Sequence, residues 1–232
     1  MNTFAALSGA LRPVLAASLA GLSGLAMAAQ VTVDVQTSEG RPAENVVVTL
    51  QPTTPWAPVP TPPPSVVAQK AQRFVPFVTA VPVGTTLRFS NEDRYDHHVR
   101  SQPGGPLGNV APAKNFEFRL DGYKGGKVAV ADVVLDAPGA IVLGCHIHGS
   151  MRGHVFVSPT PWVAVTDANG RAVIEGVPEG AADLRIWHPE QIVEQPGQRL
   201  MVGSTAVRAE TRLNFRPPTR RVLTPPTTYG NF

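Results

Sequence analysis

The alternation of apolar and polar residues near the start of the chain predicts short β-strands. Residues 31–36 read Val-Thr-Val-Asp-Val-Gln, with an apolar side chain at every second position. This period of two is typical of a strand with one face in a core. Residues 46–50 form a second apolar run, and residues 38–42 between the two runs are turn formers. We expect the two runs to pair as a hairpin.

The middle of the chain contains further short runs of the same kind. Turn signals such as Pro-Val-Gly at 82–84 and Ala-Pro-Gly at 137–139 separate several of them. Short strands at this density predict one antiparallel sandwich or barrel. The expected strands are residues 66–69, 77–81, 85–90, 98–100, 115–120, 128–135, 141–145 and 154–157.

The last third of the chain again contains short apolar runs separated by turn residues. An apolar run at 162–166 is followed by Asp-Ala-Asn-Gly at 167–170 and a second run at 171–174. Because Asn-Gly strongly favours a hairpin turn, we expect these two runs to pair. Further strands are predicted over residues 182–187 and 211–215. The whole chain is therefore expected to be all-β.

Proline-rich segments mark the boundaries. Seven prolines fall between residues 52 and 64. Proline lacks the N–H donor of a sheet ladder, so they predict a stiff linker at 53–65 that lies outside any sheet. The final segment, 217–232, is rich in Pro and Arg and is predicted to be a flexible tail.

The N-terminal residues 1–28 predict a secretory signal peptide. Arg12 precedes an apolar run at 14–25, and Ala26-Met27-Ala28 is a small-x-small cleavage pattern. The alternative is a transmembrane anchor, but the run is shorter than the roughly 20 residues that a span requires. We expect an exported, periplasmic protein without membrane insertion.

Charge excludes one class of partner. The formal net charge of +3 is too small to indicate nucleic-acid binding. Arginines nevertheless crowd the C-terminal end, where they form either a solvated surface, which we favour, or a docking patch for an acidic partner. These arginines are Arg199, Arg208, Arg212, Arg216, Arg220 and Arg221.

The single cysteine, Cys145, carries the chemistry. A lone thiol in an oxidising compartment is a liability unless it is occupied. Cys145, His148 and Met151 follow the spacing Cys-x-x-His-x-x-Met in a loop between two expected strands. Adding His97 or His98 completes a trigonal plane of two imidazoles and a thiolate, with Met151 as weak axial ligand, which is the donor set of blue copper.

Other metals and other chemistries are weaker alternatives. Zinc also binds Cys and His, but the thioether of Met151 favours copper. His146 directly follows Cys145 and does not keep the two-residue gap that separates Cys145 from His148, so it is interpreted as non-ligating. His188 is expected to cap a strand. No convincing carboxylate pair, nucleophile triad or phosphate-binding loop is present, so we do not expect an enzyme.

These residues resemble the cupredoxins, the plastocyanin and amicyanin group of blue copper proteins. The pattern Asn-x-Asp-x-x-x-His at 91–97, followed by the Cys145 motif, is similar to theirs, and the stretches at 73–76, 81–85, 113–117 and 143–148 resemble bacterial methylamine-utilisation proteins. The resemblance implies a Greek-key β-sandwich over residues 66–158 that holds one type 1 copper ion. Its ligand pattern falls on His97, Cys145, His148 and Met151. His98 stands where cupredoxins usually have Asn.

A second resemblance concerns the remainder of the chain. Residues 163–187 look like a transthyretin-like, carboxypeptidase-regulatory β-sandwich, a fold that opens with a hairpin such as residues 31–50. We therefore expect a discontinuous second sandwich, made of 30–52 and 160–216, with the cupredoxin inserted in it or fused to it.

The expected function is one-electron transfer between redox protein partners, with His148 as the electron exit that the resemblance implies. Two alternatives remain. One is copper storage or delivery, which His98 and His146 would suit. The other is a module that binds a protein or glycan and carries the cupredoxin. A copper oxidase or nitrite reductase is disfavoured, because no second copper motif is present.

Overall fold

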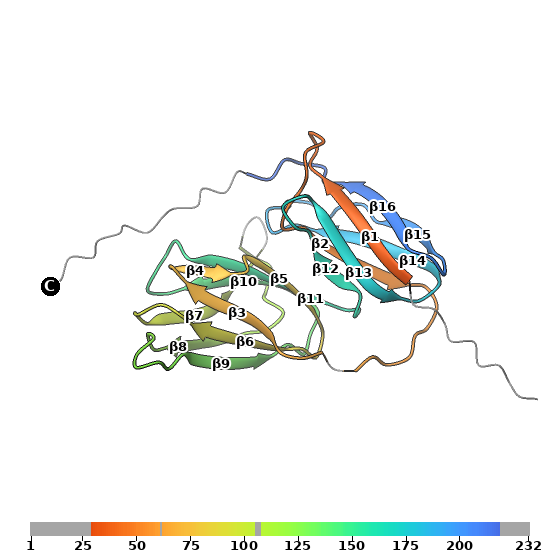
Figure 1. The fold of residues 1–232 in the computed structure, drawn as a ribbon. Coiled ribbons are helices and arrows are strands. Elements are labelled where there is room, and N and C mark those ends of the chain that lie inside the picture. The colour runs from red at the N-terminus through yellow and green to blue at the C-terminus, as the bar shows by residue number, and fades with distance from the viewer. Residues whose placement is uncertain (1–28, 61, 105–107, 219–232) are drawn as a thin grey trace, which may run out of the picture.

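A computed structural model describes residues 29–60, 62–104 and 108–218 (Figure 1). All regular elements in this part of the chain are β-strands, so the predicted all-β class is confirmed. No helix there is long and apolar enough to cross a membrane. The predicted signal peptide, 1–28, and all but two residues of the predicted tail, 217–232, lie outside the described residues.

The strands follow one another closely along the chain. They are β1 (Ala29–Gln36), β2 (Val47–Pro52), β3 (Ser65–Lys70), β4 (Arg73–Val75), β5 (Val78–Pro82), β6 (Thr86–Asn91), β7 (His97–Gln102), β8 (Glu117–Leu120), β9 (Ala129–Val134), β10 (Gly139–Cys145), β11 (Arg152–Ser158), β12 (Val163–Val165), β13 (Arg171–Val177), β14 (Gly180–Trp187), β15 (Gln198–Val202) and β16 (Val207–Arg212).

The strands build two sandwiches, each around its own apolar core. Sheets β13-β1-β16 and β12-β2-β14-β15 enclose a core that includes Val33 and Leu50. Sheets β4-β3-β6-β9 and β5-β11-β10-β7-β8 enclose another, which includes Phe89 and Leu143. We call the first the terminal sandwich and the second the central sandwich. Figure 1 shows them side by side.

The N-terminal strands belong with the strands after residue 160. β1 pairs with β13 and β16, and β2 pairs with β12 and β14. Within the described residues, β3 to β11 pair only among themselves. A discontinuous sandwich requires this pairing, while the limits 30–52 and 160–216 stay a prediction.

The hairpin expected between residues 31–36 and 46–50 was wrong. The chain does turn at 37–42, where the Thr37 N–H donates to the Arg41 carbonyl at 2.7 Å. However, β1 and β2 lie in opposite sheets of the terminal sandwich and face each other across the core. Turn residues dictate that the chain reverses. They do not dictate whether the next strand pairs with the previous one or packs over it.

The hairpin expected at Asn169-Gly170 was wrong for the same reason. Gly170 has φ of 73° and closes a tight turn, its N–H donating to the Asp167 carbonyl at 2.9 Å. Yet β12 joins β2, and β13 joins β1. The Gly170 carbonyl accepts the Val35 N–H at 2.7 Å, which ties this turn to β1 instead.

Other strand details also differ from expectation. The pairs β1–β16, β3–β6 and β5–β11 are parallel, so the sheets are mixed and not purely antiparallel. β4 and β15 were not predicted, and β16 precedes most of the strand expected at 211–215. Pro52, expected outside any sheet, ends β2 opposite Ala182. At a strand end the missing N–H donor interrupts the ladder least.

The sheet order of the central sandwich brings three segments to one end. β7 and β10 are antiparallel neighbours, with Cys145 in register with Val99. The first residue of β7 and the last residue of β10 therefore lie at the same end of the sheet. The loop from β10 to β11 turns there, which places residues 146–151 beside the start of β7.

Candidate metal centre

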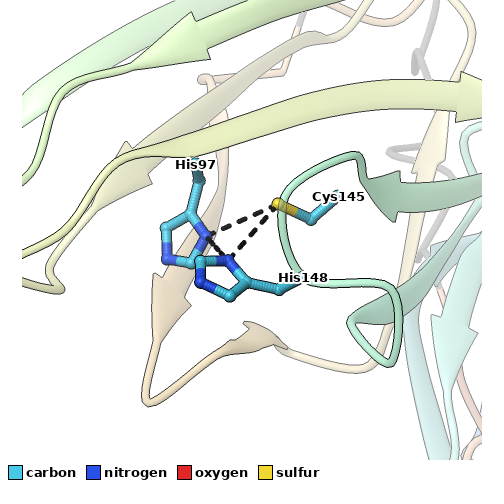
Figure 2. Close-up of side chains that lie close together, drawn as sticks. All are labelled: His97, Cys145 and His148. Atoms are coloured by element: carbon cyan, nitrogen blue, oxygen red, sulfur yellow. Dashed lines mark hydrogen bonds between the residues drawn. The ribbon is translucent and has the colours of Figure 1, made fainter. Parts of the chain in front are cut away.

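Three donor atoms converge at this end of the central sandwich. His97 opens β7, Cys145 closes β10 and His148 lies in the loop that follows. The Cys145 Sγ lies 3.7 Å from His97 Nδ1 and 3.6 Å from His148 Nδ1, and the two Nδ1 atoms lie 3.2 Å apart. Figure 2 shows all three atoms pointing toward one another. They form the one cluster of potential metal ligands of this kind among the described residues.

The spacing of these atoms fits a metal ion. The three distances define a nearly equilateral triangle whose centre lies about 2 Å from each atom. Metal–imidazole bonds have this length, and metal–thiolate bonds are slightly longer. The side chains therefore need little movement to bind a single ion in a trigonal plane.

Strand alternation decides between the two adjacent histidines. His97 is fully buried and points to Cys145, whereas His98 points to the other face of the sheet, where its Nε2 lies 2.9 Å from Glu117 Oε1. Only one of the two rings therefore reaches the cluster, while the ligand assignment itself stays a prediction. The preferred residue, His97, is the one in the cluster.

Met151 occupies the end of the same loop. Its N–H donates to the His148 carbonyl at 2.9 Å, which closes a tight turn. Its side chain is 2% exposed and belongs to the apolar core that also contains Cys145. The loop thus places Met151 in the same buried core as Cys145, three residues after His148.

The Asp93 carboxylate contacts the His97 ring on the side that faces away from Cys145. The Nε2 of His97 lies 2.9 Å from Asp93 Oδ2. The Asp93 carboxylate also accepts the backbone N–H groups of Ala71 at 2.6 Å and Gln72 at 3.0 Å, both residues having positive φ in the β3–β4 turn. Because a carboxylate only accepts, the proton of the His97 ring sits on Nε2, and Nδ1 is left to bind a metal.

The loop before β7 is itself fixed by Asn91. Its side-chain amide donates to the carbonyls of Tyr95, Leu120 and Asp121, and its oxygen accepts the Asp93 N–H at 3.0 Å. Sequence reasoning quoted Asn91 and Asp93 as part of a family pattern but gave them no role. The four-residue step from Asp93 to His97 is the signal that could have identified the contact.

Aromatic packing shields the two imidazoles. The Tyr95 ring centroid lies 5.4 Å from that of His97 and 5.3 Å from that of His148. His97 and Cys145 are buried, whereas His148 is only half-buried. Water is therefore excluded from most of the site, and one edge of His148 remains accessible.

The surroundings favour the charged form of the thiol. Burial raises the pKa of the Cys145 thiol. Hydrogen bonds from the His97 ring, from the backbone of His98 and His148 and from the His148 ring lower it by more, so that the pKa is about 6. Burial lowers the pKa of His97, and its contacts with Cys145 and Asp93 raise it overall. A thiolate at neutral pH is the form that binds metals.

The remaining histidines lie outside the cluster. His146 is exposed on the loop, and the His154 ring packs edge-on against Phe77 with centroids 5.0 Å apart. His188 follows β14, and its Nδ1 accepts the Glu190 N–H at 3.1 Å. This contact lies just after the end of β14, and the capping role expected of His188 stays a prediction.

Comparison with known proteins gives partial likenesses. No family model matches the chain, and no curated protein matches it. Similar solved structures include the copper-containing nitrite reductase from Thermus scotoductus SA-01, at 27% identity and TM-score 0.35, over 47% of this chain and 25% of that one. Another is a methionine-to-glutamine mutant of amicyanin with Cu(I), at 23% identity and TM-score 0.30, over 41% of this chain and 82% of that one.

A third similar structure is a purple cupredoxin from Nitrosopumilus maritimus, at 21% identity and TM-score 0.33. The match covers 42% of this chain and the full length of that protein. The chain thus spans a quarter of the nitrite reductase and most or all of the two cupredoxins.

Proposed function

We propose that this protein is a type 1 copper protein that carries single electrons between redox proteins. The observation that carries the proposal is the triangle of His97 Nδ1, Cys145 Sγ and His148 Nδ1, with sides of 3.2 to 3.7 Å. Together with Met151 it supplies the two imidazoles, thiolate and weak axial thioether of a blue copper site. Copper in such a site takes up and releases one electron.

The residues of the chain supply a rigid, dry setting. Asp93 fixes the His97 ring, and the sheet register fixes Cys145 opposite Val99. Rigid ligands keep the geometry the same in both oxidation states, which keeps the reorganisation that accompanies electron transfer small. The half-buried His148 is the one ligand of the cluster within reach of a partner protein, and we assign it the electron exit.

The donor set favours copper over zinc. A structural zinc site is tetrahedral and uses four N, O or S ligands, whereas this cluster offers three strong donors and a thioether residue. Copper accepts thioether ligands readily. With the Met151 thioether as a fourth ligand, the ion would have no open position for a substrate, and we propose a carrier and not an enzyme.

The wider context belongs to the same proposal. The signal-peptide pattern supports export to the periplasm, and the residue patterns support a cupredoxin of the methylamine-utilisation type beside a transthyretin-like sandwich. In an oxidising compartment, bound copper would protect the single thiol.

The experiment is to add one equivalent of Cu(II) to the protein and record the visible absorption spectrum. An intense blue thiolate-to-copper band is expected, lost in Cys145→Ser and altered in Met151→Leu. Cyclic voltammetry should then show a reversible one-electron couple. A pale spectrum, like that of imidazole-bound copper, would reject the site. A blue protein that releases its copper readily to a chelator and shows no reversible couple would instead favour copper delivery.

A further inference from the structure

Three potential metal ligands lie together on the outer face of the central sandwich. Strands β8, β7 and β10 are consecutive neighbours in one sheet. Glu117 begins β8, His98 is the second residue of β7 and His146 directly follows β10. The three residues thus come from three adjacent segments, and all of them are outside the buried cluster.

The three side chains lie near one another, although their ligand atoms do not all fall within 4.8 Å of one another as those of the buried cluster do. The His98 Nε2 lies 2.9 Å from Glu117 Oε1, and the His98 and His146 ring centroids lie 5.6 Å apart. The N–H of His146 donates to the His98 carbonyl at 2.9 Å, so the backbone keeps these two residues side by side. His146 is exposed, and the shared site requires its ring to turn toward His98.

The charges around these residues are mixed, because Arg100 lies directly opposite Glu117 in the β7–β8 register. Arg119 lies directly opposite His98 in the β7–β8 register, but its guanidinium is paired with Asp96. Glu117 contributes a negative charge on the same face, and it already contacts His98. Two imidazoles and one carboxylate are thus grouped at this edge of the sheet.

We propose that His98, His146 and Glu117 form a second, solvent-facing site for a transition-metal ion, with Cu(II) as the ion of this chemistry that the protein meets. Imidazole and carboxylate ligands suit Cu(II), Ni(II) and Zn(II) better than Mg(II) or Ca(II). The site goes beyond the electron carrier proposed above: its ligands are separate from the buried ones, and only the choice of Cu(II) rests on that proposal. Because His146 and His148 share one loop, a metal ion held here lies beside the entrance to the buried donors.

The test uses the full protein without an affinity tag, first loaded with one equivalent of Cu(II). A second equivalent is then added and followed by electron paramagnetic resonance and equilibrium dialysis. We expect the second equivalent to bind with the signal of imidazole-ligated copper, distinct from that of thiolate-ligated copper. In the double variant His98→Gln/His146→Gln its affinity should fall by at least about tenfold. Glu117→Gln should give a smaller loss, and the control His154→Gln should give none.

The two proposals fail in different ways. If no blue band forms in any variant, the electron carrier is rejected, while the signal of imidazole-ligated copper still tests the outer site. The outer site is rejected if the double variant keeps the second equivalent with unchanged affinity. It is also rejected if the double variant loses only the blue band, because the two histidines would then serve the buried cluster.

Discussion

The Nε2 atom of His97 lies 2.9 Å from Asp93 Oδ2, on the opposite side of the ring from the thiol of Cys145. The carboxylate is held by two backbone N–H groups of the β3–β4 turn. A turn between two strands of one sheet thus orients a side chain that belongs to the other sheet. The candidate centre depends on this turn although none of its residues contributes a metal ligand.

Replacing Asp93 should therefore weaken the centre without removing a ligand. In Asp93→Asn the amide cannot accept from both backbone groups and from the His97 ring as the carboxylate does. We expect copper affinity to fall on the order of 10- to 100-fold and the reduction potential to shift. Competition with a chelator and voltammetry measure the two quantities. Asp132→Asn, which removes an exposed ion pair with Arg88, is the matched control. Equal copper affinity in the two variants would show that the Asp93 contact is incidental.

We expect Met151 to affect the reduction potential of the centre more than its visible absorption. Met151→Leu keeps an apolar side chain of similar size in a buried position but removes the thioether donor. Loss of the weak axial ligand favours the reduced ion, so the reduction potential should rise while a blue band persists in altered form. Met201→Leu, at an exposed position on β15, should leave both unchanged. A potential that is the same in both variants contradicts an axial role.

A glycine outside the ligand loop should matter more than one inside it. A Cβ on Gly122 would lie 2.6 Å from the carbonyl carbon of Arg94 and 2.7 Å from the backbone N of Tyr95, in the segment that leads into His97. Gly122→Ala should therefore displace this segment, lower the free energy of unfolding by about 1–3 kcal/mol and weaken the blue band.

The matched substitution is Gly149→Ala, directly after His148, where an added Cβ meets nothing within 4 Å. It should leave the spectrum and the urea unfolding midpoint nearly unchanged. Should Gly149→Ala prove the more damaging of the two, the packing of the segment before β7 does not control the centre.

Stability should fall in mild acid because of His188. Burial lowers its pKa from 6.5 to about 4, so between these values the unfolded chain binds a proton that the folded chain does not. The free energy of unfolding therefore decreases as the pH falls from 6.5 toward 4. From pH 7 to pH 5 the loss due to this group is about 2 kcal/mol.

Urea unfolding of the metal-free protein at the two pH values measures this loss. His188→Gln should lose less stability than the unaltered chain over the same interval, because its side chain does not titrate. An equal loss in both proteins would mean that other groups carry the pH dependence.

The candidate centre was largely predictable from sequence because its ligands obey local rules. The three-residue steps from Cys145 to His148 and Met151 lie in one loop, and strand alternation separates His97 from His98. The step of four residues could have indicated the contact of Asp93 with His97, but the way in which Asp93 itself is held was not predictable in this way. It depends on the β3–β4 turn, whose contact with residue 93 is set by packing and not by neighbouring sequence.

The strands themselves were predicted better than their partners. Val31, Val33 and Val35 alternate with polar residues and are buried as expected. The alternation does not determine that β1 pairs with β13 and β16 and not with β2. Alternation reports which side of a strand meets a core. The partner is decided by which of several apolar strands gives the best long-range register, a choice that requires the assembled sandwich.

The pairing of β1 with β16 has a consequence for the order in which the chain folds. Gln36 and Arg212 meet in this ladder although 176 residues separate them, and Thr160 donates to the Leu50 carbonyl across 110 residues. Closing such loops in an unfolded chain is entropically costly and slow. The strands of the central sandwich find all their partners between residues 65 and 158, so this half can assemble first. Once assembled, it brings Pro62 and Pro159 to the walls of one cavity and shortens the effective loop that β2 and β12 must close. The half that carries the candidate centre can thus serve as the template on which the two parts of the terminal sandwich meet.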